Sequence, residues 1–252
     1  MAKRVRVQGA GDGQQTLLLL HGLGATGDVW NSWRPLLERH WPGRWLAPDL
    51  PGHGGSEPLD SYSFETLAAA IADVLDSRDR LVILGHSLGG VLGLVLAGDR
   101  FDLAVDRVVG VGIKVAWSED ELVKARQLSE RRVAWFPTRG EAASRYLRIS
   151  GLTGLLEPDS PEVDTGIRQE AEGWRLALDP AAFGVGAPDM PALLASSRAP
   201  VLLARGESDA MVTDEHLARL GTPTATLPGL GHNAHVEDPA AVFRLVDGTV
   251  LR

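Results

Sequence analysis

Short, uninterrupted runs of apolar residues recur along the chain, and a turn and a longer amphipathic segment usually follow each one. The runs occupy residues 16–20, 44–49, 81–85, 107–113, 200–206 and 224–229. Apolar runs without alternation suit strands that are buried on both faces, as in a parallel sheet. Between two of these runs, segment 63–77 places Leu67, Ile71 and Val74 on one face of a helix. The pattern predicts an α/β fold with a mostly parallel, helix-flanked sheet.

Segment 114–194 departs from this rhythm. It contains charged helical patterns and no convincing strand. We therefore expect a small helical cap, inserted after the strand at 107–113, and a core domain made of residues 1–113 and 195–252. Ligands of such sheets bind beyond the C-terminal ends of the strands, so the cap is expected to cover the binding site.

Composition excludes several classes of function. Hydrophobic residues make up 44% of the 252 residues, as is typical of globular proteins, and the net charge of -8 argues against general binding to nucleic acid or anionic membranes. The chain has no cysteine, which excludes disulfides and thiolate chemistry, and its seven histidines show no metal-site spacing. With no signal-like or membrane-length apolar run, we expect a cytoplasmic protein without a metal, and we leave its oligomeric state open.

The sequence Gly-His-Ser-Leu-Gly at 85–89 places Ser87 between the apolar run 81–85 and an apolar helical run. A strand, a sharp turn and a helix form the setting of a nucleophile elbow, in which flanking glycines permit a strained turn that exposes the serine hydroxyl. The alternative is an idle serine in a glycine-rich turn. The setting favours Ser87 as a nucleophile.

A serine hydroxyl needs a general base, and that base needs an acid to orient it. His232 follows the last predicted strand and a glycine, where a loop can direct its imidazole inward, and His235 is the alternative base. Asp209 follows the strand at 200–206, with Glu207 and Asp214 as alternative acids. The order serine, acid, histidine along the chain is that of an α/β-hydrolase triad.

Backbone N–H groups are needed to stabilise the oxyanion of an acyl-transfer reaction. Leu88 directly follows the serine, and Leu23 lies on the loop 21–24 after the first long apolar run. Trp30 follows that loop and Trp135 lies in the expected cap. Each tryptophan is a candidate for the wall of an apolar substrate pocket, with plain packing as the alternative.

With these motifs the chain resembles the α/β-hydrolase family. Besides 85–89, segments 17–30, 47–58 and 231–239 carry the resemblance. It implies a cofactor-free hydrolase in which Ser87, Asp209 and His232 form the triad and an acyl-serine intermediate is made. Many members have two or three strands before the first long apolar run, whereas only residues 3–7 offer one here.

The resemblance and the motifs together predict a hydrolase that acts on a small carboxylic ester or related acyl substrate. Dehalogenases and epoxide hydrolases of this family use aspartate as the nucleophile, so Ser87 argues against both. A lactonase, a thioesterase or a carbon–carbon bond hydrolase with the same triad remains an alternative. A ligand receptor with little turnover is the alternative from another class.

Overall fold

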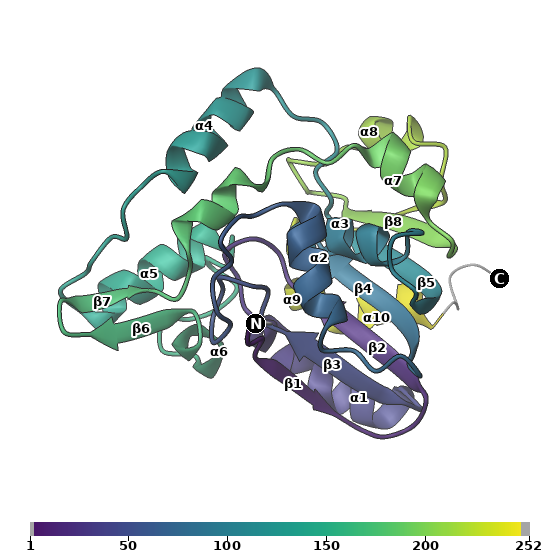
Figure 1. Cartoon of the computed structure of the whole chain (residues 1–252), viewed down its shortest axis with the longest axis horizontal. Helices are drawn as coiled ribbons and strands as arrows, with labels where there is room; N and C mark the ends of the chain where they lie inside the picture. The colour runs from purple at the N-terminus through teal and green to yellow at the C-terminus, as the bar shows by residue number, and fades with distance from the viewer. Residues whose placement is uncertain (1–2, 248–252) are drawn as a thin grey trace.

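The central sheet of the computed structural model, which describes residues 3–247, has seven strands in the order β1-β3-β2-β4-β5-β8-β9 (Figure 1). Their bounds are β1 Val7–Ala10, β2 Gln15–Leu20, β3 Arg44–Pro48, β4 Arg80–His86, β5 Ala104–Val111, β8 Val201–Gly206 and β9 Thr224–Leu227. Only β1 runs antiparallel to its neighbour, and all other neighbouring strands are parallel. The predicted mostly parallel sheet is confirmed.

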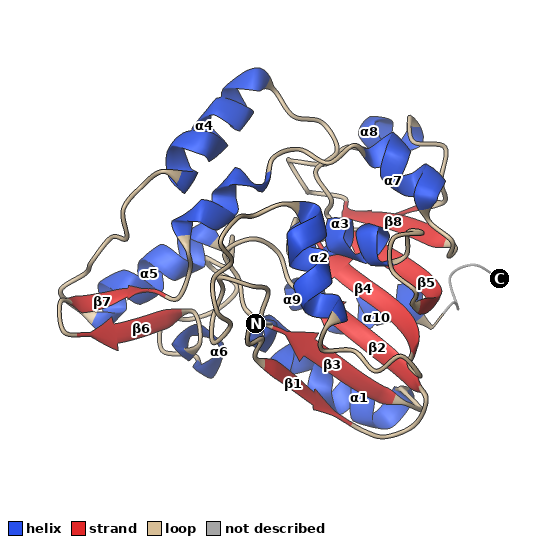
Figure 2. Cartoon of the chain, viewed as in Figure 1, coloured by secondary structure: helices blue, strands red, loops and turns tan. Residues whose placement is uncertain are grey.

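Successive residues of β2 show why its sequence is apolar without alternation. Leu17 and Leu19 belong to the core on one face of the sheet, Leu18 and Leu20 belong to the core on the other, and all four are fully buried. Helices cover both faces of the sheet, so these four leucine side chains are removed from water (Figure 2).

The two faces of the sheet are covered by different helices. α1 (Arg34–His40) and α10 (Pro239–Val246) contribute to the first core, and α2 (Phe64–Ala72), α3 (Leu88–Leu96) and α7 (Met190–Ser196) contribute to the second. α2 begins with a capping box of Ser63 and Thr66 and ends earlier than the predicted 63–77. In the part of the chain that the structure describes, no helix is both long and apolar enough to cross a membrane.

The N-terminal edge of the sheet carries one strand before β2, at Val7–Ala10 rather than at residues 3–7. Val7 pairs with Pro48 and Ala10 pairs with Trp45 of β3. Residues just before β1 instead meet the loop after β3, since the N–H of Asp49 donates to the carbonyl of Arg6 at 2.9 Å.

Between β5 and α7, the chain forms α4 (Glu119–Ser129), α5 (Arg139–Ile149), the short α6 (Pro161–Asp164) and the 3₁₀ helix η2 (Pro180–Val185). It also forms an antiparallel hairpin of β6 (Ile167–Glu170) and β7 (Gly173–Leu176), in a segment where the sequence pattern showed no convincing strand. These strands are short and partly exposed and therefore leave no apolar run in the sequence. Gly173, with φ of 127°, permits the tight turn between them.

We call residues 114–185 the cap; they project beyond one end of the sheet (Figure 1). α7 begins within the predicted insertion 114–194, but its Met190 is buried in the same core as α2 and α3, on one face of the sheet. The predicted division into core and cap therefore stays a prediction, with α7 packing on the core side.

Candidate active site

Ser87 occupies a strained turn between β4 and α3. Its φ of 50° and ψ of -116° make it the only non-glycine residue with positive φ within the described residues. The helix packs tightly on the strand: a Cβ on Gly85 would lie 2.3 Å from the carbonyl oxygen of Gly89, and one on Gly89 would lie 2.3 Å from that of Leu20. Real side chains cannot fit at either position. The glycines therefore fix the serine turn, as in a nucleophile elbow.

A histidine–aspartate pair lies at the same edge of the sheet. Nδ1 of His232, on the loop after β9, is 2.9 Å from Oδ2 of Asp209, on the loop after β8. Asp209 is buried, and its other oxygen accepts the N–H of Met211 at 2.8 Å. Burial alone would raise the pKa of Asp209, but the hydrogen bond and charge of His232 and the backbone N–H groups outweigh it and lower that pKa. The carboxylate is therefore ionised and holds the imidazole.

The alternative acids and base have other partners. Glu207 accepts the N–H of Gly229, Asp214 binds Arg205 and Thr226, and His235 is buried against the ring of Trp30. The structure thus brings Asp209, and neither alternative acid, to the histidine that follows the last strand.

Ser87 and His232 both contact the end of β5. The N–H of Ser87 donates to the carbonyl of Val111, and a Cβ on Gly112 would lie 3.2 Å from the imidazole of His232. Within residues 3–247, the Ser87 hydroxyl makes no hydrogen bond with His232. Proton transfer requires the two side chains to come within hydrogen-bond reach of each other.

The two amides expected to stabilise an oxyanion lie beside Ser87. Leu88 is the first residue of α3, and its N–H therefore points out of the helix start. Leu23 lines the same cavity as Ser87 and Leu88, and its neighbour Gly22 is so close to Ser87 that a Cβ there would lie 3.3 Å from the serine Cβ. Among residues 3–247, neither amide has a hydrogen-bond acceptor. Both amides are therefore available to a ligand.

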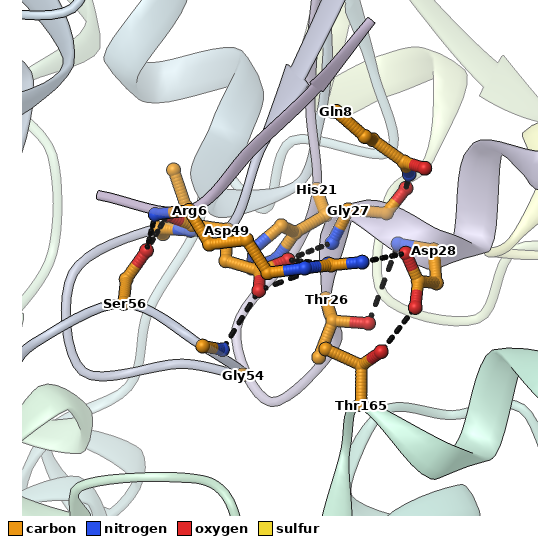
Figure 3. Close-up of polar contacts among 12 residues, drawn as sticks. Arg6, Gln8, His21, Thr26, Gly27, Asp28, Asp49, Gly54, Ser56 and Thr165 are labelled. Atoms are coloured by element: carbon orange, nitrogen blue, oxygen red, sulfur yellow. Dashed lines mark hydrogen bonds and ion pairs between the residues drawn. The ribbon is translucent and has the colours of Figure 1, made fainter.

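An ion-pair network stabilises the loop after β2, which carries Leu23 and which we call the oxyanion loop (Figure 3). Arg6 donates to both oxygens of Asp49 at 3.1 Å and to Asp28 at 2.9 Å, and Asp49 also accepts the N–H of Gly27 at 2.7 Å. Thr165 of the cap donates to the other oxygen of Asp28. The network joins β1, the loops after β2 and β3, and the cap, and the sequence motifs gave no indication of it.

Four further histidines surround the site without an evident chemical role. His21 accepts the N–H of Leu50 and donates to the carbonyl of Gly22, and His86 donates to the carbonyl of His232. Burial lowers the pKa of His21 to about 4, lowers those of His53 and His235 to about 3, and lowers the pKa of His86 well below its ordinary value. All four are therefore neutral at pH 7 and support the loops. The described residues contain no group of three or more potential ligands arranged to hold a metal ion.

Ser87 opens into a cavity of about 280 Å³ beneath α4. Its wall is mostly apolar and includes Phe64, Trp117, Leu128 and Phe183. Of these, three come from the cap, whose contribution the sequence pattern did not specify. The only sequence signal for these cap residues was the position of their segment after β5, because insertions at that edge of the sheet cover the site.

The two tryptophans expected at the pocket lie elsewhere. Trp30 has no exposed surface and packs against Trp33 and His235 in the core, so its large apolar side chain is used for packing. Trp135 is 38% exposed and lines a separate depression beside the hairpin, where Arg175 lies over its ring. The expectation that these residues line the pocket is wrong for the Ser87 cavity.

The strand order and the strained serine turn are those of an α/β hydrolase. A family model described as the alpha/beta hydrolase family matches residues 17–245, and the chain belongs to that family. Its membership of this family supports a hydrolase.

Two curated relatives match nearly the whole chain. The chain is 26% identical over 262 residues to the 2-succinyl-6-hydroxy-2,4-cyclohexadiene-1-carboxylate synthase of Serratia proteamaculans, covering 96% of this chain and 94% of that protein. It is 28% identical over 249 residues to the synthase of the same name from Citrobacter koseri, covering 96% of each.

Solved structures share the fold over almost the whole chain. A thioesterase domain from the curacin biosynthetic pathway has a TM-score of 0.78 at 24% identity, with 97% of this chain and 95% of that one covered. An E-2-(acetamidomethylene)succinate hydrolase has a TM-score of 0.80 at 21% identity, with 99% and 96% covered. At these identities the likeness establishes the fold alone.

Proposed function

We propose that this chain is a cofactor-free serine hydrolase that cleaves a small carboxylic ester or related acyl substrate through an acyl-serine intermediate. The observation that carries the proposal is a strained, partly exposed serine that opens into a cavity, together with a buried aspartate that is hydrogen-bonded to His232 at the same edge of the sheet. A serine held only for structure would have no reason to occupy a strained backbone conformation.

The proposed reaction uses each group in turn. Because Nδ1 of His232 is held by Asp209, its Nε2 is the atom that accepts the proton of Ser87 as the serine oxygen attacks the carbonyl carbon. The N–H groups of Leu23 and Leu88 stabilise the tetrahedral oxyanion, and each such donor typically contributes about 10²–10³ in rate. His232 protonates the departing alcohol and then activates water, which releases the acid and regenerates Ser87.

The test is hydrolysis of 4-nitrophenyl esters from acetate to decanoate by the wild-type chain and by Ser87→Ala, with circular dichroism to verify that both are folded. Turnover that disappears in Ser87→Ala supports the proposal, and the chain-length profile measures the acyl pocket. Equal turnover by both proteins would refute it.

A second candidate is a reaction like the one named for the curated relatives. The near-complete coverage of the chain by two synthases of the same name favours it. A folded wild-type protein that hydrolyses none of the esters, yet forms 2-succinyl-6-hydroxy-2,4-cyclohexadiene-1-carboxylate in a Ser87-dependent way, would support it over the esterase.

A further inference from the structure

A second cavity, of about 120 Å³, lies inside the cap. Arg131 and Arg132, just after α4, and Arg145, on α5, line it. The remaining lining residues are apolar, and no acidic side chain is among them. Arg131 and Arg132 are also exposed to solvent. An apolar cavity bordered by three arginines is suited to a ligand with an apolar part and an anionic end.

This arginine cavity adjoins the Ser87 cavity. Leu128 of α4 and Phe183 of η2 line both of them. Ile149, on the wall of the arginine cavity, also contacts the oxyanion loop, since a Cβ on Gly24 would lie 2.6 Å from its side chain. A substrate bound at Ser87 therefore needs to extend only past the Leu128 and Phe183 side chains to reach the arginines.

In the described part of the chain, the three arginines of the cavity lack the ion pairs that Arg139 and Arg175 of the cap make. Arg139 pairs with Asp164 at 2.5 Å, and Arg175 pairs with Glu170 at 2.6 Å. For Arg131, Arg132 and Arg145, residues 3–247 provide no side-chain ion pair or hydrogen bond. Arg145 is nevertheless only partly exposed.

A shortage of acidic residues does not explain why these three arginines have no ion pair among the described residues, since the chain has 33 Asp and Glu against 25 Lys and Arg. Like charges placed around one apolar cavity repel one another, and an anion bound among them removes that cost.

We propose that the arginine cavity is the part of the substrate site that binds an anionic group, a carboxylate or a phosphate, on the end of the substrate distant from the reacting carbonyl. The proposal rests on the proposed hydrolase function. The anion has two possible sources, a carboxylate at the far end of the acyl chain or the phosphates of a leaving group such as coenzyme A.

Two pairs of substrates separate these sources. The first pair is 4-nitrophenyl pentanoate and mono-4-nitrophenyl glutarate, which differ by a terminal carboxylate on an acyl chain of equal length. The second pair is butyryl-coenzyme A and the butyryl thioester of N-acetylcysteamine, which lacks the phosphates. The wild-type chain is expected to prefer the anionic member of one pair, and that pair identifies the source.

Arg145→Gln is expected to raise KM for the preferred anionic substrate roughly ten- to a hundredfold, the range for one charge-assisted hydrogen bond, with kcat little changed. Its effect on the neutral member should stay within about twofold. Arg126→Gln is the matched control, because Arg126 lies on α4, is exposed and lines neither cavity. It also removes one positive charge from the cap.

A binding measurement keeps this proposal separate from the proposed function. Titration calorimetry with glutarate and with coenzyme A should give binding to wild type and to Ser87→Ala that Arg145→Gln weakens. Such binding would stand even if no ester were hydrolysed. No preference for either anionic substrate, or equal losses in Arg145→Gln and Arg126→Gln, would overturn the proposal.

Discussion

The edge of the sheet and the cap both surround the Ser87 cavity, but they hold their polar groups in opposite ways. At the sheet edge, Asp209 is buried and hydrogen-bonded, and Ser87 is fixed by its backbone. In the cap, Arg131 and Arg145 line a cavity without a partner among the described residues. A catalytic step needs side chains that are already oriented. A binding site, in contrast, can contain a charged side chain that is paired only when the ligand binds. Under the two proposals, this contrast separates a catalytic region from a substrate-selecting one.

Ser87→Ala tests the catalytic side of the comparison with the largest expected effect. Removal of the nucleophile of a serine hydrolase typically lowers kcat by about 10⁴–10⁶. The fold should be unchanged, because Ser87 makes no side-chain capping bond to α3. Ester hydrolysis and urea denaturation measure the two properties. Residual turnover near the wild-type rate would show that this edge of the sheet is not the catalytic centre.

Asp209→Asn should lower kcat by about 10³–10⁴ while the protein stays folded. The amide can present an N–H to His232 and thereby favour the wrong tautomer of the imidazole. Glu207→Gln is the control, since Glu207 lies two residues away and accepts the N–H of Gly229 instead. A comparable loss in both variants would mean that general charge at this edge matters more than the hydrogen bond to His232.

Acid should destabilise the sheet edge. His21, His53 and His235 are buried with pKa values of about 4, 3 and 3, so the unfolded chain binds more protons than the folded one below about pH 6.5. Stability is therefore present above that pH and is lost as pH falls. Each histidine contributes up to about 1.4 kcal/mol per pH unit, and we expect a loss of about 3–5 kcal/mol between about pH 7 and about pH 5.5.

Urea denaturation at several pH values measures this loss. Asp209 contributes in the same direction because its pKa is lowered, and Asp49 opposes it because burial, despite its hydrogen bonds, raises its pKa. The lowered pKa of Asp209 places its titration below this window. His235→Phe should flatten the dependence, since Nδ1 of His235 is buried without a partner in the described part of the chain. An unchanged slope in His235→Phe would contradict the explanation.

Arg6→Met should lower the free energy of unfolding by about 1–3 kcal/mol, less than for a fully buried pair because the Arg6 side chain is 35% exposed. It leaves Asp49, which is fully buried, without its cation. Because Asp49 also holds Gly27, the change should reduce kcat through displacement of the oxyanion loop. Arg78→Met is the control, since Arg78 pairs with Asp76 on the surface and its loss should destabilise the protein less than that of Arg6.

The sequence predicted the sheet edge much better than the cap, for a physical reason. Strands buried on both faces and a serine between glycines leave local signals, and Ser87, Asp209 and His232 each follow a strand. The strands of the β6–β7 hairpin are short and partly exposed and leave no apolar run. The Arg6 network and the arginine cavity depend on residues far apart in the chain, such as Arg6 with Asp28 and Leu128 with Phe183. Trp30 shows the same limit, because a large apolar side chain suits a pocket wall and a core equally well.

The smallest expected effect is a difference in stability between glycine and alanine variants, which compares backbone strain at the sheet edge and in the cap. Glycine adopts a φ of 50° without strain, whereas alanine does not. Ser87→Gly should therefore be more stable than Ser87→Ala by about 1 kcal/mol. Ser144 is exposed within α5 of the cap, where the order should reverse, because glycine in a helix interior is about 1 kcal/mol less stable than alanine. Urea denaturation of the four variants measures both differences. If alanine were the more stable replacement at both positions, the turn at Ser87 would hold no strain, and the reason for treating this serine differently from any other would be lost.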